Sequence, residues 1–412
     1  MNKRTFQKVY ILGGYQTDFK RNWHTEHSGL YEIMESTVKE TFKNCNVKIK
    51  DIESAHVGNF AGELFSNQGQ LGGMLISILP EVSGIPVSRH EAACASGSMA
   101  ILSAMADIQS GKHNTSLVVG VELMKNVSSK QAADNLAAAA WVNKEGEDAQ
   151  FMWPYMFSKV YETYNETYGI DHNHLNKISE INLQNAKENP NSQTRNWEIN
   201  SDYFSNDDSL NPKIEGEIRK SDCGRITDGG AAVILANEEY AKKYANENNI
   251  DIAEIPFIKG WGHTTAPLSL NEKIVNIKKE SYAFPYLRKA INDAYNKASI
   301  TVDDIDVFET HDCFSISEYV AIEHFGLTGP GEAWKAIENG SIKKDGKNPV
   351  NPSGGLIGLG HPVGATGVRM LLDAYKQLTK KAGSYQIKNA KNVACLNFGG
   401  SFTTSACFVV AI

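Results

Sequence analysis

Cys94 lies in the segment HEAACASGSM (90–99), where nearly every neighbour has a small side chain. A strand pattern ends near His90 and a helical pattern begins near Ser96, which places the thiol at the start of a helix. Unpaired N–H groups at a helix N-terminus stabilise a thiolate and lower the pKa of a cysteine. We therefore expect a nucleophilic thiol with room for a carbonyl group beside it. An inert core thiol remains the alternative, because free cysteine behaves as a small hydrophobe.

A histidine and a second cysteine follow an apolar strand in the segment ETHDCFSISEY (309–319). His311 and Cys313 are two residues apart, so alternation along a strand would direct both side chains to one face. A zinc site is a weak interpretation, because no third or fourth ligand lies nearby in the chain. A structural His–Cys pair in the core remains open.

The glycine-rich segment NPSGGLIGLGHPVGATG (351–367) holds His361 directly before a proline. Dense glycine lets the backbone approach a ligand closely, and we expect a helix from about Ala365. A histidine held there suits a base that activates a nucleophile. A dinucleotide-binding loop is a weak competing interpretation, because no strand precedes the GLIGLG run with an acidic residue at the right distance after it.

A fourth candidate is the segment CLNFGGSFTTSA (395–406), in which a strand pattern runs into Gly399 and Gly400. Adjacent glycines after a strand offer exposed N–H groups to a developing oxyanion. A plain turn is the alternative interpretation.

The elements that must position these residues follow an α/β pattern, since short apolar runs alternate with helix-periodic stretches. Three pairs of segments resemble each other in the same order: 47–60 with 300–314, 96–112 with 366–382, and 118–122 with 393–397. We interpret them as two halves of the same topology. Packed about a pseudo-twofold axis, such halves would bring Cys94, His361, His311 and Cys313 toward one cleft.

Residues 123–250 match neither half. We therefore assign 1–122 to the N-terminal half, 123–250 to an inserted loop or lid region, and 251–412 to the C-terminal half. The insertion is expected to return to the N-terminal half near 220–236. So long an insertion is commonly a lid or binding region, with a surface excursion as the alternative.

The composition of the chain limits which partners and which cellular compartment we expect. A length of 412 residues exceeds one ordinary core, and a formal charge of −7 argues against nucleic acid or an anionic membrane as the main partner. The six cysteines show no CxxC spacing, which argues against a disulfide framework. No apolar stretch approaches the roughly 18 residues of a membrane span, and the N-terminal run is too short for a secretory signal. We expect a reducing, cytoplasmic setting.

Four motifs occur together and in order: ACASG, HDCF, GGLIGLGHPVGATG and a terminal FGG turn. This combination resembles the thiolase family, and specifically its sterol-carrier-protein-2-type branch. The resemblance extends from VYILGGYQTDF (9–19) to the terminal strand. It implies the thiolase fold: two repeated βαβαβαββ halves packed as a layered α-β-α-β-α core, with an inserted loop domain that covers CoA.

Carried over residue by residue, the resemblance implies a role for each candidate. Cys94 would be the nucleophile that takes an acyl group as a thioester, and His361 would take its proton. Cys313 would be the acid/base at the α-carbon of the second acyl-CoA, and His311 would help stabilise the enolate oxygen. The backbone N–H groups of Cys94 and Gly399 would form the oxyanion hole. No metal is implied.

One position departs from the family pattern. Ordinary thiolases carry a cysteine in a terminal CxG motif, and here Asn397 stands in its place. Members with an HDCF segment supply the second cysteine from that segment, so the resemblance implies that the acid/base is relocated to Cys313.

The resemblance implies an acetyl-CoA acetyltransferase or 3-ketoacyl-CoA thiolase of fatty acid metabolism, with acyl-CoA as substrate and no permanently bound cofactor. It also implies a homodimer or homotetramer. Two alternatives remain: a thiolase-fold acyltransferase with a non-CoA carbon acceptor, and a weakly catalytic protein that binds acyl-CoA.

Arg219, Lys220 and Arg225 are interpreted as a solvated basic face, with CoA phosphates as the alternative. The cluster FMWPYMF (151–157) is interpreted as core packing, with a substrate channel as the alternative.

Overall fold

A nine-stranded sheet runs through the residues that the structure, a computed structural model, describes: 7–274 and 281–412. The strand order is β3-β2-β4-β7-β1-β8-β11-β10-β9. A separate hairpin pairs β5 with β6. The strands are β1 (Val9–Gln16), β2 (Ser54–Gly58), β3 (Val87–His90), β4 (Thr115–Glu122), β5 (Lys213–Glu215), β6 (Ile218–Arg219), β7 (Gly229–Ala236), β8 (Phe257–Thr265), β9 (Val307–Thr310), β10 (Asn392–Gly399) and β11 (Thr404–Ala411).

The two halves of the sheet mirror each other. In the N-terminal half β2 runs parallel to β4, and β4, β7 and β1 then pair antiparallel. In the C-terminal half β9 runs parallel to β10, and β10, β11 and β8 pair antiparallel. The halves meet where β1 pairs with β8 through Val9–Ile258 and Tyr10–Phe257. This symmetry agrees with the repeat in the sequence, whose matched segments hold β2 and β9, and β4 and β10.

Alternation along the strands divides the interior into layers. In β4, Leu117 and Val119 face a core beneath one set of helices, whereas Val118 faces the centre of the molecule. In β10, Leu396 faces a core on the opposite outer side, whereas Cys395 faces the centre. Five layers result, α-β-α-β-α, as the resemblance predicts.

The helices fill these layers according to which face of each is apolar. Helices α1 (Leu30–Cys45), α3 (Leu71–Ile78) and α8 (Glu238–Asn248) cover the N-terminal half, and α10 (Pro285–Ala298) and α11 (Ser315–Phe325) cover the C-terminal half. Helices α4 (Ser96–Gln109) and α13 (Thr366–Leu378) lie between the two half-sheets. The N-termini of both central helices follow segments that carry candidate residues, Cys94 and His361.

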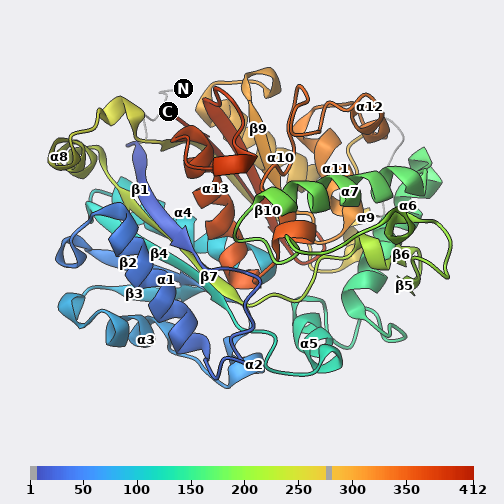
Figure 1. Ribbon diagram of the computed structural model, residues 1–412, viewed down its shortest axis with the longest axis horizontal. Helices are drawn as coiled ribbons and strands as arrows, with labels where there is room; N and C mark the ends of the chain where they lie inside the picture. Colours follow the sequence, from blue (N-terminus) through green and yellow to red (C-terminus); the bar gives the residue numbers. More distant parts are fainter. Residues whose placement is uncertain (1–6, 275–280) are drawn as a thin grey trace.

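The insertion is not a surface excursion. Its helices are α5 (Ser129–Leu136), α6 (Met152–Tyr168) and α7 (His172–Glu188); Figure 1 shows α6 and α7 beside the C-terminal half, whereas α5 packs near residues 61–65 of the N-terminal half. Apolar residues of α6 and α7, among them Phe157, Tyr164 and Ile178, join the outer core of that half. The chain then returns to the N-terminal sheet with β7, within the segment expected to do so.

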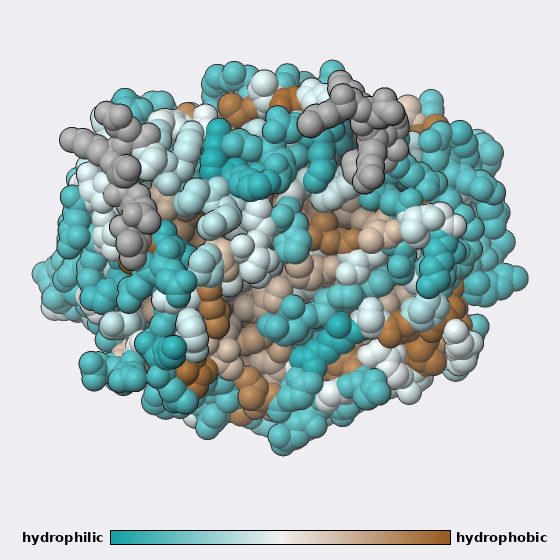
Figure 2. All heavy atoms as spheres, turned by 180° about the vertical axis from the view of Figure 1, so that it is seen from behind, coloured by the Kyte–Doolittle hydropathy of each residue, from teal (hydrophilic) through white to brown (hydrophobic). Residues whose placement is uncertain are grey.

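The described residues also form three short helices: α2 (Gly62–Ser66), α9 (Leu270–Ile274) and α12 (Ala333–Glu338). Among the residues described, every helix is too short or too polar to cross a bilayer. Figure 2 shows the face opposite to that of Figure 1, where hydrophilic residues form most of the margin and hydrophobic or neutral ones gather across the middle.

Candidate active site

Cys94 lies in a single 3₁₀ turn, Ala93–Ala95, between the end of β3 and the start of α4. The preceding residue, Ala93, has a φ of +48°, a conformation that L-residues rarely adopt. The backbone therefore turns sharply at this point and presents the thiol at the helix start, as the sequence predicts.

The small residues around Cys94 have a packing role that the sequence did not reveal. A Cβ atom on Gly97 would lie 2.7 Å from the carbonyl oxygen of Gly364, and one on Gly58 would lie 2.6 Å from Gly97 Cα. Only glycine permits such contacts between backbones. They bring the start of α4 against the segment that follows His361, and so join the two halves at the site.

The expected low pKa of Cys94 is wrong. Burial above all, together with the nearby Glu122 and Glu91 carboxylates, raises the pKa of the thiol to about 12. The backbone N–H groups of Gly400 and of Cys94 itself act in the opposite direction. The thiol is therefore the resting form, and its proton must be removed during the reaction.

His361 is held in one orientation by Thr366. Its Nδ1 lies 2.7 Å from Thr366 Oγ1, and the Thr366 hydroxyl donates its only proton to the carbonyl of Pro362 at 2.9 Å. Oγ1 therefore accepts from Nδ1–H, which leaves a lone pair on Nε2. Within the described chain, His361 Nε2 has no hydrogen-bond partner. Burial lowers the pKa of His361 to about 3, so the ring is neutral and Nε2 can accept a proton.

His311 follows β9 directly and is fully buried. Its Nδ1 lies 3.0 Å from the amide nitrogen of Asn397, and its ring is 4.1 Å from that of Phe398 between centroids. Burial, followed by the nearby His361, holds the pKa of His311 well below its usual value. The sequence analysis noted Asn397 only as a departure from the family pattern, and the structure places it against both His311 and Cys94.

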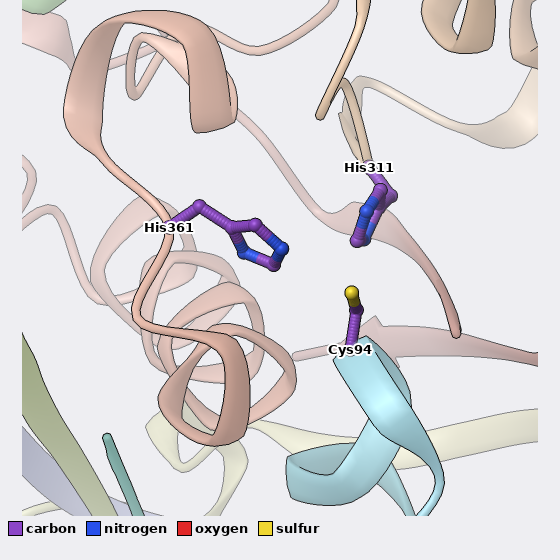
Figure 3. Close-up of side chains that lie close together, drawn as sticks. All are labelled: Cys94, His311 and His361. Atoms are coloured by element: carbon purple, nitrogen blue, oxygen red, sulfur yellow. The ribbon is translucent and has the colours of Figure 1, made fainter. Parts of the chain in front are cut away.

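Cys94, His311 and His361 converge from three segments far apart in the chain (Figure 3). One donor atom from each lies within 4.8 Å of the others, and the two rings meet edge to face at a centroid distance of 5.0 Å. No other group of three or more potential ligands is found in residues 7–274 and 281–412. One sulfur and two imidazoles are ligands that suit zinc. The sequence showed no third ligand near His311, but the fold brings Cys94 and His361 beside it. The three side chains are also the set needed for a thiol nucleophile with its base.

Cys313 lies just beyond the end of β9, on a bend rather than on the strand itself. The alternation argument for His311 and Cys313 therefore fails, although both residues are at the site. Cys313 lines the same cavity as Cys94, and its Sγ lies 3.9 Å from Ser317 Oγ. Burial first, and then the Cys94 thiol, raises the pKa of Cys313 well above its usual value, so this residue is protonated.

The two glycines after β10 have different surroundings. Gly399 packs against the Cys94 turn, where a Cβ atom would lie 2.1 Å from the carbonyl oxygen of Ala92. It is the backbone N–H of Gly400 that interacts with the Cys94 sulfur. The oxyanion hole expected from the N–H groups of Cys94 and Gly399 stays a prediction, and the Gly400 N–H is a further donor beside the Cys94 sulfur.

A cavity of about 750 Å³ opens over Cys94, Cys313 and His361. Its far wall is apolar and comes from the insertion: Leu136, Phe151, Met152, Trp153, Pro154 and Phe157. The FMWPYMF cluster therefore does both: part of it lines the cavity, and Met156 and Phe157 are buried in the outer core, as the preference for core packing expected. Lys125 and Arg225 also line the cavity, whereas Arg219 is buried and paired with Asp208 at 2.7 Å. The basic-face interpretation is thus wrong for Arg219.

Glu122, at the end of β4, is a fully buried carboxylate that sequence reasoning missed. It accepts hydrogen bonds from the backbone N–H groups of Phe60, Ala61 and Gly364 at 2.9, 3.1 and 3.0 Å. Asn59 donates to it at 2.8 Å. One side chain thus ties the N-terminal half to the loop that carries His361. Glu122 is the last residue of the strand segment SLVVGVE (116–122). A charged residue directly after an apolar run was the signal in the sequence that could have pointed to it.

Comparisons with known proteins agree with this architecture. Residues 9–239 match the thiolase N-terminal domain, and residues 271–411 match the thiolase C-terminal domain-like family. The chain belongs to the thiolase family. It is an acyltransferase of that family, with the cysteine–histidine site described above.

Individual relatives cover nearly the whole chain. The acetyl-CoA acetyltransferase of Methanothermobacter thermautotrophicus is 30% identical over 97% of this chain and 98% of its own. Human sterol carrier protein 2 is 29% identical over 96% of this chain and 70% of its own.

Solved structures share the fold. The Ltp2-ChsH2(DUF35) aldolase aligns with a TM-score of 0.77 at 16% identity, over 98% of this chain and 97% of the other. The acetyl-CoA acetyltransferase of Syntrophomonas wolfei aligns with a TM-score of 0.67 at 17% identity, over 99% of each chain. At such identities the likeness concerns the fold alone.

Proposed function

We propose that this chain is an acetyl-CoA acetyltransferase or 3-ketoacyl-CoA thiolase that works through an acyl thioester on Cys94. The observation that carries the proposal is the convergence of Cys94, His311 and His361, of which Cys94 and His361 line one cavity. Relatives named as acetyl-CoA acetyltransferases over nearly the full chain support it.

The first half-reaction forms the thioester. His361 Nε2 takes the thiol proton of Cys94, and the sulfur attacks the thioester carbonyl of the acyl-CoA. The developing oxyanion is stabilised by the N–H groups of Cys94 and Gly399, with the Gly400 N–H as a further donor. CoA then leaves with the proton held by His361, and the acyl group stays on Cys94.

The second half-reaction makes or breaks a carbon–carbon bond. Cys313 exchanges a proton with the α-carbon, and His311 donates a hydrogen bond to the enolate oxygen. Because burial keeps Cys313 protonated, it is ready to act first as an acid. That is the role it has in thiolytic cleavage of a 3-ketoacyl-CoA, where the departing enolate must be protonated.

Acyl-CoA enters as a substrate, and no permanent cofactor is part of the proposal. The apolar wall from the insertion suits the acyl group and pantetheine arm, whereas Lys125 and Arg225 offer positive charge for phosphate. A thiolase-fold acyltransferase with a non-CoA carbon acceptor is the second candidate, favoured by the aromatic lining of the cavity. Activity on an aromatic acceptor, with none on acetoacetyl-CoA, would select it.

We also propose a homodimer or homotetramer in the cytoplasm. The exposed edge strand β3 supports self-association, since its outer backbone groups are unpaired within the sheet. All six cysteines are free thiols, which supports a reducing compartment.

The division into 1–122, 123–250 and 251–412 is retained as a proposal, with β7 and α8 returning to the N-terminal half.

The direct test is acylation of the protein. Incubation with acetyl-CoA should leave an acetyl group on the peptide that holds Cys94, as mass spectrometry will show. Cys94→Ala should lose the adduct, and Cys223→Ala, at another thiol of the same cavity, should retain it. A folded wild-type protein without the adduct would contradict the assignment.

Cys313 is tested by separating the two half-reactions. Cys313→Ala should still acylate Cys94 but lose thiolysis of acetoacetyl-CoA by about 10²-fold or more, the usual contribution of a general acid. Thiolysis that persists at the wild-type rate would remove Cys313 from the mechanism.

A further inference from the structure

We propose that Asn397 is a positioning residue that fixes the tautomer of His311, so that His311 Nε2 carries the ring proton and can donate it in a hydrogen bond to the substrate's carbonyl oxygen. The inference rests on the proposed function and names a residue to which no role has been given.

The orientation of the Asn397 amide follows from two contacts. Its nitrogen lies 3.2 Å from the carbonyl oxygen of Cys94, and a carbonyl oxygen can only accept. On the other side, Ser98 Oγ donates to Asn397 Oδ1 at 2.7 Å. The contact with the Cys94 carbonyl requires the NH₂ group to face Cys94 and His311, because turning the amide over would set two carbonyl oxygens against each other.

The second amide hydrogen sets the ring. Asn397 Nδ2 lies 3.0 Å from His311 Nδ1 and can only donate, so Nδ1 must be the unprotonated nitrogen. The fully buried ring is neutral, since burial holds its pKa well below the usual value. The single ring proton therefore sits on Nε2, which has no hydrogen-bond partner in the part of the chain that the structure describes.

The two histidines consequently carry opposite tautomers. Thr366 accepts from His361 Nδ1 and leaves His361 Nε2 as a base, whereas Asn397 donates to His311 Nδ1 and leaves His311 Nε2–H as a donor. One nitrogen of each ring lies within 4.8 Å of the Cys94 sulfur. The neighbouring side chains thus give the two histidines different roles: His361 accepts a proton, and His311 stabilises an oxyanion.

The surroundings hold Asn397 rigidly. The residue is 1% exposed, and Gly367 in α13 makes room for the contact with Ser98. A Cβ atom at position 367 would lie 2.4 Å from Ser98 Oγ and 2.8 Å from Asn397 Oδ1. The amide also links the backbone of the nucleophile turn to His311, so the two move together.

The test is Asn397→Asp, which keeps the shape and replaces the donor with an acceptor. The carboxylate would accept from His311 Nδ1–H, and His311 Nε2 would lose its proton. We expect kcat to fall about 10²- to 10³-fold, as for loss of an oxyanion-hole donor, with KM changed only a few-fold. In ¹⁵N-histidine-labelled protein, the NMR signature of His311 should change from the Nε2–H to the Nδ1–H tautomer.

A double-mutant cycle separates this role from general damage to the fold. In a His311→Ala background, Asn397→Asp should cost little further activity, because the residue acts through His311. Asn397→Ala, which leaves the ring free to adopt either tautomer, should fall between the wild type and Asn397→Asp.

Three results would overturn the inference: an Nδ1–H tautomer at His311 in the wild type, an unchanged kcat in Asn397→Asp, or fully additive losses in the cycle. Its failure is distinguishable from failure of the proposed function. A wild type that acylates Cys94 but shows one of these results refutes only the role of Asn397. A wild type that does not acylate Cys94 refutes the function itself.

Discussion

The hydroxyl of Thr366 accepts a hydrogen bond from His361 Nδ1 at 2.7 Å while donating its own proton to Pro362. Because Nδ1 carries the ring proton, Nε2 keeps a lone pair and can act as the base. Thr366→Val keeps the side-chain shape and removes the acceptor. We expect kcat to fall about 10- to 100-fold, because a ring free to turn or to change tautomer presents its base only part of the time.

The matched control is Thr366→Ser, which retains the hydroxyl and should keep most of the activity. Both variants should be compared by the rate at which Cys94 is acylated in a single turnover. Equal rates in the valine and serine variants would show that the hydroxyl has no part in orienting His361.

Lys273 in α9 is 9% exposed and lies against Ser401 and Thr403, which follow Gly400 in the chain. Its ammonium donates to the Ser401 carbonyl, the Ser401 hydroxyl and the Thr403 hydroxyl at 2.9, 2.8 and 2.6 Å. Burial lowers the pKa of Lys273 to about 7, although Glu145 and Glu272 oppose that shift. The folded state therefore loses this proton at a lower pH than the unfolded state does.

A stability prediction follows from this difference. Between about pH 7 and the unfolded pKa near 10.4, the unfolded state binds more protons at this site, so stability rises with pH. The free energy of unfolding of the wild type, relative to Lys273→Met, should increase by at most about 1.4 kcal/mol per pH unit. Denaturant titrations from pH 7 to 9 measure it, and Lys273→Arg should show no such increase because arginine does not titrate. A pH-independent difference from Lys273→Met would contradict the assignment.

Zinc should inhibit the enzyme. Tetrahedral Zn²⁺ places its sulfur and nitrogen ligands about 3.5 Å apart, and the donor atoms of Cys94, His311 and His361 already lie within 4.8 Å. We expect micromolar Zn²⁺ to block acylation and alkylation of Cys94, with recovery on addition of EDTA. EDTA alone should leave activity unchanged, because the proposed chemistry uses no metal. Activity lost on chelation would argue for a resident ion.

The internal repeat predicted most of the architecture. The matches between 96–112 and 366–382, and between 118–122 and 393–397, correspond to α4 with α13 and to β4 with β10. Apolar spacing determines which face of a helix or strand is buried, so repeated spacing predicts repeated packing. The insertion was harder to interpret, because FMWPYMF has the same composition whether it fills a core or lines a channel.

Local sequence also misled in two places. A helix start next to Cys94 predicted a lowered pKa, but burial raises that pKa to about 12. The spacing of His311 and Cys313 predicted a shared strand face, but the chain bends after Thr310. In both cases a property of a short segment was overruled by what packs against it.

Residue types and motif order were enough to single out residues that the structure brings together: Cys94, His311, His361, Cys313 and the turn at Gly399 and Gly400. They could not show that Glu122 joins the halves, that the Gly400 N–H lies beside the Cys94 sulfur, or that Asn397 and Thr366 set opposite tautomers. Those facts depend on hydrogen bonds between residues up to about three hundred positions apart, such as Asn397 with Cys94. A sequence records which groups can donate or accept, but the partner of each group is chosen only when distant segments pack together.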